Sequence, residues 1–168
     1  MPGPTDDYLA YRKWFDAEYD ALRLPPNCTE AEGPTFNYSN QYTWTLEWCL
    51  LFGDDPKSYI RIREHFAKRA GLSLSRRISF AYHYGPIVGL DSDGTPLRNP
   101  ADPVFVRIDN VKQAAHLHPE RDPSEHLPQS SIRDLVLDAV DLFDFVRAAL
   151  RSRETGRPMA EELGYHIS

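Results

Sequence analysis

The sequence has few cysteines and no long hydrophobic run. Only Cys28 and Cys49 are present among 168 residues, which is too few for a disulfide-scaffolded secreted domain, and neither belongs to a CxxC metal or redox pair. No apolar run approaches the ~20 residues of a membrane helix, and the first residues lack the basic and apolar regions of a secretory signal. We therefore expect a cytoplasmic protein with reduced thiols and no membrane partner.

Familiar enzyme motifs are also missing. The sequence contains no phosphate loop, no GxGxxG, no HExxH and no GxSxG. Nothing near either cysteine in the sequence would activate its thiol. We expect no cofactor and no bound metal.

The composition is that of one soluble folded domain. Hydrophobic residues make up 41% and aromatic residues 12%, while 14 prolines and 9 glycines indicate many turns. A chain of this length can bury one ordinary core. We expect a single domain over residues 1–168, with a core of about 5–151 and a tail, 152–168, that is flexible or helical only with a partner.

Charge is distributed unevenly along the chain. The net charge is -6, yet the segment 57–77 holds seven basic residues and one acidic residue, a local charge of +6. We expect this segment to bind nucleic acid, or else to be a solvated hairpin. Its candidate nucleic-acid-binding residues are Arg61, Arg63, Lys68 and Arg69. The segment 132–150 has a local charge of -2, and we expect a basic protein partner there, on a helix face carrying Asp134, Asp138, Asp141 and Asp144.

Hydrophobic periodicity predicts two terminal helices and several strands between them. A spacing of three and four predicts a helix that follows Thr5 and ends before Pro25, and a second helix that begins at Ser131 with Asp134 as its capping partner. Residues 27–40 show no periodicity and are predicted to be a loop. Alternation predicts strands over 42–52, 59–66, 78–84 and 104–110. The expected fold is α+β, with a mainly antiparallel sheet of about four to six strands against which both terminal helices pack.

Glu64 is unusual because its strand position places it among core residues. A buried carboxylate is costly unless it is paired, so Glu64 needs an arginine, histidine or tyrosine partner. A structural role, with Glu64 near solvent or neutralising Arg107, is as reasonable as a role in a site.

His116 and His118 are two residues apart and lie on one side of an extended chain. They could bind a metal ion, with Asp109, Glu64, Glu120 or His126 as further ligands, but none of the spacings is that of a known zinc site. They could instead act as general acid and base beside a phosphate-binding arginine. We predict one catalytic cluster at the end of the sheet, formed by Glu64, Arg107, Asp109, His116 and His118.

The order of these elements resembles that of one protein family. A glutamate ends the second strand, an aromatic strand (Phe80–Tyr84) follows, and then come an Asp93-Gly94 turn, the strand end Arg107-Ile108-Asp109-Asn110, an H-x-H element and a leucine-rich last helix. From Trp44 to Leu150 the chain resembles the TumE-type toxins of bacterial toxin–antitoxin loci. It departs from them at Gln113-Ala114-Ala115, where such proteins have a Pro-His-His cluster.

This resemblance implies a growth-inhibiting protein that acts on RNA, as an endoribonuclease, and is held inactive by an antitoxin protein. The residues alone leave open whether the chain is an enzyme. The alternative is a non-catalytic protein-interaction module without nuclease activity, which binds its partner through the acidic helix or a sheet edge.

Overall fold

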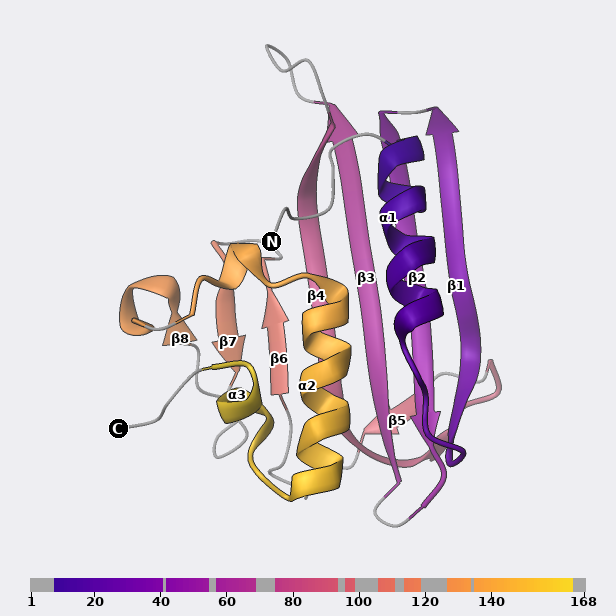
Figure 1. Cartoon of the computed structure of the whole chain (residues 1–168), viewed down its shortest axis with the longest axis vertical. Helices are drawn as coiled ribbons and strands as arrows, with labels where there is room; N and C mark the ends of the chain where they lie inside the picture. The colour runs from indigo at the N-terminus through magenta and orange to yellow at the C-terminus, as the bar shows by residue number, and fades with distance from the viewer. Residues whose placement is uncertain are drawn as a thin grey trace.

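Helices cover one face of a single antiparallel sheet (Figure 1). The computed structural model describes residues 8–40, 42–54, 57–68, 75–93, 96–98, 106–110, 114–118, 127–133 and 135–164. The order of elements, with a helix at each end and only strands in the middle, forces neighbouring strands to run in opposite directions. The expected α+β fold with an antiparallel sheet and packed terminal helices is confirmed.

The first helix, α1 (Tyr8–Ala21), forms as its apolar spacing predicts. Tyr8, Tyr11 and Phe15 are one turn apart and are buried against the sheet. The predicted N-cap, Thr5, lies outside the described residues. Among the helices that the structure describes, none has the length and apolarity to span a membrane.

Within the described residues the sheet has eight strands, and every neighbouring pair of them is antiparallel. In the sheet they lie in the order β1-β2-β3-β4-β6-β7-β8, and β5 pairs beside β4. Their bounds are β1 (Cys28–Asn40), β2 (Thr43–Phe52), β3 (Ser58–Lys68), β4 (Ser75–Leu90), β5 (Pro96–Arg98), β6 (Val106–Asp109), β7 (His116–His118) and β8 (Leu127–Pro128).

The predicted loop over 27–40 is wrong, because residues 28–40 form β1, which pairs with β2 along its length. As the outermost strand, β1 leaves most of its side chains exposed, so its sequence lacks the alternation that marks a half-buried strand. Gly33 and Pro34 are tolerated there because an edge strand has no partner on one side. With β1 and three short strands, the sheet is wider than the four to six strands expected.

The last long helix begins later than predicted. Two 3₁₀ turns, η1 (Gln129–Ser131) and η2 (Leu137–Ala139), precede α2 (Leu142–Thr155). Asp141 accepts a hydrogen bond from the Asp144 backbone N–H at 2.9 Å, and Asp144 accepts one from the Asp141 N–H at 3.2 Å. This reciprocal capping box fixes the start of α2, whereas the predicted start at Ser131 is wrong.

The expected tail continues as helix through residue 155 and then packs on α2. The helix ends at Gly156, whose φ of 73° is a left-handed conformation that favours glycine. The short helix α3 (Met159–Glu162) follows, with Met159 and Ala160 buried. Arg151 on α2 binds Glu162 at 3.0 Å. Up to Gly164, the tail is therefore held by contacts within this chain.

The strand pleat divides the side chains between two faces of the sheet. We call the face covered by α1 and α2 the helix face (Figure 1), and the opposite one the back face. The helix face carries the large aromatic core: Trp48 lies 6.0 Å from both Phe15 of α1 and Phe143 of α2, measured between ring centroids. Register then assigns every other residue of β3 and β4 to the back face. Charged side chains gather on that back face.

Candidate functional site

Four of the five predicted catalytic residues lie together on the back face. Arg107 and Asp109 are on β6, His116 and His118 on β7, and the register pairs Asp109 with His116 and Arg107 with His118. Directly paired residues of antiparallel strands project to the same face. We call these four residues the β6–β7 cluster.

Hydrogen bonds and burial hold the β6–β7 cluster in place. Arg107 donates from Nε to Oδ2 of Asp109, while Nε2 of His116 lies 3.5 Å from Oδ1 of the same carboxylate. The rings of His116 and His118 lie edge to face with centroids 5.0 Å apart. Asp109, His116 and His118 are at most 5% exposed, whereas the Arg107 side chain is 31% exposed. The cluster thus has a buried interior and one side that reaches solvent.

The backbone sets the tautomer of His116. Its Nδ1 lies 3.0 Å from the carbonyl oxygen of Ala114, which can only accept a hydrogen bond, so Nδ1 must carry the hydrogen. In the neutral ring, Nε2 then presents a lone pair toward Asp109. One atom from each of Asp109, His116 and His118 lies within 4.8 Å of the others, so these three residues could hold a metal ion.

Glu64 does not belong to the β6–β7 cluster. Glu64 pairs with Phe80 on one face of the sheet. The next pair, Arg63 with Ala81, projects to the opposite face, and Ala81 pairs in turn with Asp109 there. The Glu64 side chain has no exposed surface and accepts hydrogen bonds from Tyr11 and Tyr82. The prediction that Glu64 needs an arginine or tyrosine partner is confirmed, but the single five-residue cluster is wrong because the pleat separates the two groups.

Arg77 is the arginine that neutralises Glu64, with Nη1 3.4 Å from Oε1. It also donates to the backbone carbonyls of Val140 at 3.1 Å and Asp138 at 2.6 Å. Simple alternation puts Arg77 on the back face. A register shift in β4 pairs His65 with Ser79 but Phe66 with Arg77, and this bulge turns Arg77 to the helix face.

Electrostatics reinforce this buried network. Burial, and next the charge of Glu64, raise the pKa of Tyr11 and of Tyr82 well above the usual value, so both phenols remain donors. Burial opposes the charge of Arg77, but the interactions with Tyr82 and Glu64 outweigh it and raise its pKa. The network joins α1, β3, β4 and the segment before α2. We assign it a structural role.

Two of the predicted nucleic-acid-binding residues line up with the β6–β7 cluster. Across β3, β4, β6 and β7, the register forms one row of Arg61, His83, Arg107 and His118, and a second row of Arg63, Ala81, Asp109 and His116. We call them the Arg61 row and the Arg63 row. Lys68 lies at the far end of β3, with Nζ 4.7 Å from the centre of the Tyr42 ring, and Arg69 lies outside the described residues.

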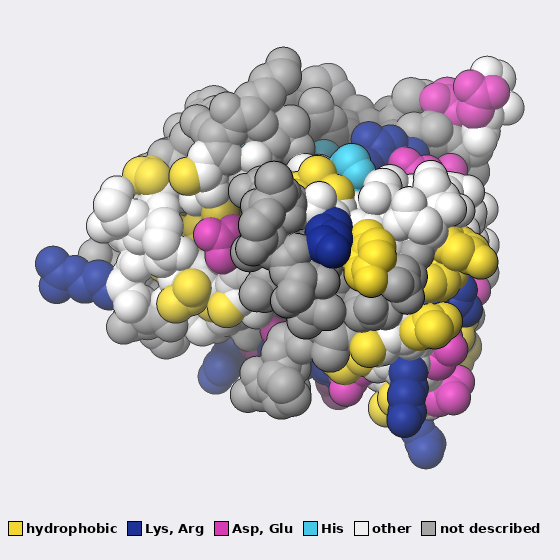
Figure 2. All heavy atoms as spheres, turned by 90° about the horizontal axis from the view of Figure 1, so that it is seen from above, with side chains coloured by type: hydrophobic (Ala, Val, Ile, Leu, Met, Phe, Trp, Pro, Cys, Tyr) yellow, Lys and Arg dark blue, Asp and Glu magenta, His cyan; other side chains and the backbone are white. Residues whose placement is uncertain are grey.

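A shallow groove of about 270 Å³ adjoins these rows. Among its lining residues are Glu47 and Arg63, an ion pair 3.7 Å apart, and Ala81, the register partner of Asp109. Basic and acidic side chains are interspersed on the surface seen from above (Figure 2).

The cysteines are free thiols, as expected. Burial raises the pKa of both Cys28 and Cys49 to about 11. A thiol with such a pKa is protonated near pH 7, so neither residue is an activated nucleophile.

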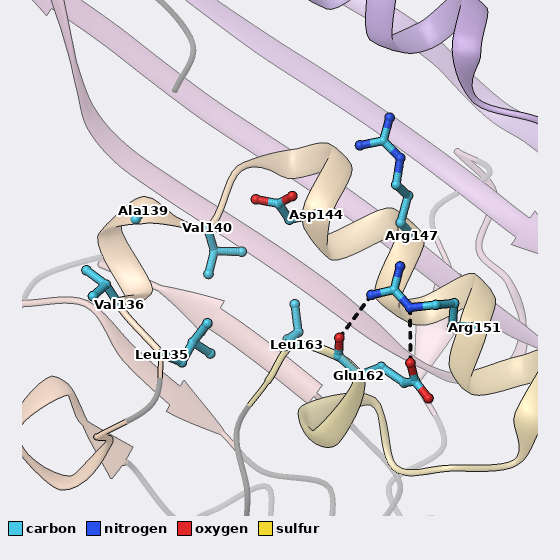
Figure 3. A pocket seen from close by; sticks show the side chains of 9 residues that line it. All are labelled: Leu135, Val136, Ala139, Val140, Asp144, Arg147, Arg151, Glu162 and Leu163. Carbon is cyan, nitrogen blue, oxygen red and sulfur yellow. Dashed lines mark hydrogen bonds and ion pairs between the residues drawn. The ribbon is translucent and has the colours of Figure 1, made fainter. Parts of the chain in front are cut away.

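The predicted acidic helix face is wrong. Asp138 lies in η2, Asp141 caps α2 and is buried, and Asp144 completes the capping box; Asp134 lies outside the described residues. Asp144 instead borders a groove of about 280 Å³, shared with Arg147 and Arg151 (Figure 3). Asp141 and Asp144 thus serve local backbone structure, and basic residues accompany Asp144 where it lines the groove.

No family model matches the chain, and neither a curated protein nor a solved structure is similar to it at the significance required.

Proposed function

We propose that this chain is a toxin-like protein of a toxin–antitoxin pair that binds and cleaves RNA on the back face of its sheet. The observation that carries the proposal is the alignment of Arg61 and Arg63 with the β6–β7 cluster in two cross-strand rows. Polyanion-binding groups and buried reactive groups thus share one face. The order of sequence elements that resembles TumE-type toxins supports the same conclusion.

The Arg61 row contains two arginines, Arg107 within the β6–β7 cluster and Arg61 outside it. Adjacent strands are about 4.8 Å apart, so the backbones at Arg61 and Arg107, two strands apart, are separated by about 10 Å. Side chains at that spacing can contact different phosphates of one strand. Arginine suits such contacts because its planar guanidinium donates several hydrogen bonds to phosphate.

The β6–β7 cluster contains the groups that phosphodiester cleavage requires. The reaction needs activation of the attacking hydroxyl and positive charge beside the phosphate oxygens. Arg107 donates from Nε to Asp109, and the guanidinium of this partly exposed side chain carries four further N–H groups suited to phosphate. His116 and His118 supply imidazole nitrogens in the buried interior beside it. We assign Arg107 to phosphate binding and the two histidines to general base and general acid catalysis, one accepting the proton of the attacking hydroxyl and the other donating a proton to the leaving oxygen.

The proposal includes an antitoxin protein as the partner. A ribonuclease that acts in the cell producing it must be inhibited until it is needed, and the neighbouring gene product is the proposed inhibitor.

Induced expression with and without the neighbouring gene tests this function. We expect growth arrest that the neighbour relieves, and cleavage of a defined single-stranded RNA by the purified chain. Arg107→Ala and His118→Asn should each lower cleavage by roughly 10²-fold or more. His65→Ala is the matched control, because His65 lies on the same face but pairs with Thr45 and Ser79. Circular dichroism checks folding, and full cleavage by both folded cluster variants would refute the assignment.

The groove of Figure 3 favours a second function, that of a non-catalytic interaction module. Leu135, Val136, Val140 and Leu163 give it an apolar lining, and Val136 is 61% exposed. Exposed apolar grooves are typical of protein-binding sites. Growth arrest that persists in Arg107→Ala but is lost in Val136→Asp would support this second function.

A further inference from the structure

We propose that Asp109, His116 and His118 form a binding site for one divalent transition-metal ion of the zinc class. Two imidazoles and one carboxylate are the donor set that such ions prefer, while Mg²⁺ and Ca²⁺ prefer oxygen ligands alone. The three donor atoms lie within 4.8 Å of one another. This inference depends on the geometry of the three side chains and not on RNA being the substrate.

The contact between His116 and Asp109 has the geometry of two ligands of one ion. With the hydrogen of His116 on Nδ1, its Nε2 and Oδ1 of Asp109 are two acceptors that face each other. A positive charge between two such acceptors, either a proton or a metal ion, stabilises their approach. A charged hydrogen bond would draw the atoms to about 2.7–2.9 Å. Two ligands of a tetrahedral zinc ion, at bond lengths of about 2.0–2.2 Å, are about 3.4 Å apart, which is close to the observed 3.5 Å.

The surroundings hold two of the three ligands in place. Arg107 binds Oδ2 of Asp109, which turns Oδ1 toward His116. The Ala114 carbonyl holds the Nδ1 side of the His116 ring, so Nε2 points inward. Hydrogen-bond partners of this kind are usual behind metal ligands, because they orient the ligand and select its tautomer. Strand pairing between β6 and β7 fixes the spacing of all three residues before an ion binds.

Three protein ligands leave one position of a tetrahedral ion for a fourth ligand. Sites with three protein ligands and one exchangeable position are typical of catalytic zinc. With neutral imidazoles, the charges of Asp109 and Arg107 cancel, so a divalent ion gives the cluster a net charge of +2, which suits a phosphodiester. A role for the ion in cleavage rests on the proposed function, and in that role His116 and His118 act as ligands in place of proton transfer. Binding of the ion does not depend on the proposed function.

Titration of the untagged, metal-stripped full chain with Zn²⁺ tests the site. We expect one ion per chain, and replacement by Co²⁺ should give the intense visible absorption of four-coordinate cobalt. Asp109→Asn, His116→Ala and His118→Ala should each weaken Zn²⁺ binding by roughly 100-fold or more, and Arg107→Ala by about 10- to 100-fold. His65→Ala should bind Zn²⁺ as the wild type does.

Absence of stoichiometric Zn²⁺ binding, or binding that all three ligand variants retain, overturns the proposal. Circular dichroism of each metal-free variant separates loss of a ligand from loss of the fold, and His118→Gln provides a milder replacement. Zn²⁺ binding without RNA cleavage would support the metal site and refute the proposed function alone. RNA cleavage without any Zn²⁺ binding would support the proposed function and refute the metal site.

Discussion

Tyr11 on α1 donates a hydrogen bond to Glu64 on β3, across 53 positions of sequence. Tyr82 donates to the same carboxylate from β4, and Arg77 lies 3.4 Å from it. A single buried acid therefore links the first helix to the middle of the sheet.

Glu64→Ala should lower the free energy of unfolding by about 3–5 kcal/mol, because it leaves the Arg77 charge and two phenols without their shared acceptor. Urea denaturation measures this change. Glu47→Ala is the control, since Glu47 is a half-exposed acid whose pair with Arg63 is worth about 1 kcal/mol or less. Similar losses in both variants would contradict the buried network.

Neutralising Arg61 and Arg63 together should weaken RNA binding and reduce its salt dependence. The slope of log affinity against log salt should fall by about 1.4, or about 0.7 for each lost phosphate contact on a single strand. Fluorescence anisotropy at several salt concentrations measures the slope. Lys57→Ala with Lys68→Ala removes the same charge from the residue before β3 and from its last residue, and should change the slope less. Equal effects of the two double variants would argue against the cross-strand rows as the binding surface.

Asp141→Asn should alter the pH dependence of stability. Burial, the largest cause, raises the pKa of Asp141 to about 6. The folded chain therefore keeps this proton to higher pH than the unfolded chain, so Asp141 lowers stability as pH rises from about 4 to about 6. Asparagine remains a good N-cap and does not ionise.

Between pH 4 and pH 7, the free energy of unfolding of Asp141→Asn should rise by about 1–3 kcal/mol relative to that of the wild type. Urea denaturation across that range measures the difference. A constant difference between the two proteins would show that Asp141 does not titrate there.

Gly156→Ala should destabilise the chain by about 1 kcal/mol, because φ of 73° is unfavourable for any residue with a Cβ. A Cβ at this position has no atom within 4 Å, so the cost is one of backbone conformation and not of space. Gly33→Ala is matched, since its Cβ also has no neighbour within 4 Å and its φ is not positive. Thermal unfolding should separate the two variants.

The sequence predicts those elements whose burial follows a simple period. Alternation in β2 and β3 and the stripe of Tyr8, Tyr11 and Phe15 predict their structures well. The edge strand β1 has too little burial to produce alternation. The start of α2 could not be chosen from sequence, because a capping pair with the same spacing occurs at Ser131 and at Asp141.

The candidate site, like the fold, can be predicted only in part from the sequence. The pairing of Arg107 and Asp109 with His116 and His118 follows from two short strands that meet, and residue spacing predicts it. Whether Glu64 shares a face with them depends on the register of two further strand pairs, β3 with β4 and β4 with β6. The role of Arg77 depends on a bulge, which no periodic pattern reveals.

Contacts between the two ends of the chain have a consequence for its synthesis. Trp14 of α1 lies edge to face with Phe143 of α2, with ring centroids 5.4 Å apart, and Glu18 binds Arg147 at 2.5 Å. Helix α1 thus lacks part of its packing until α2, much later in the sequence, has been translated. Nascent chains that stop before residue 143 must expose aromatic surface, which makes them targets for chaperones and proteases.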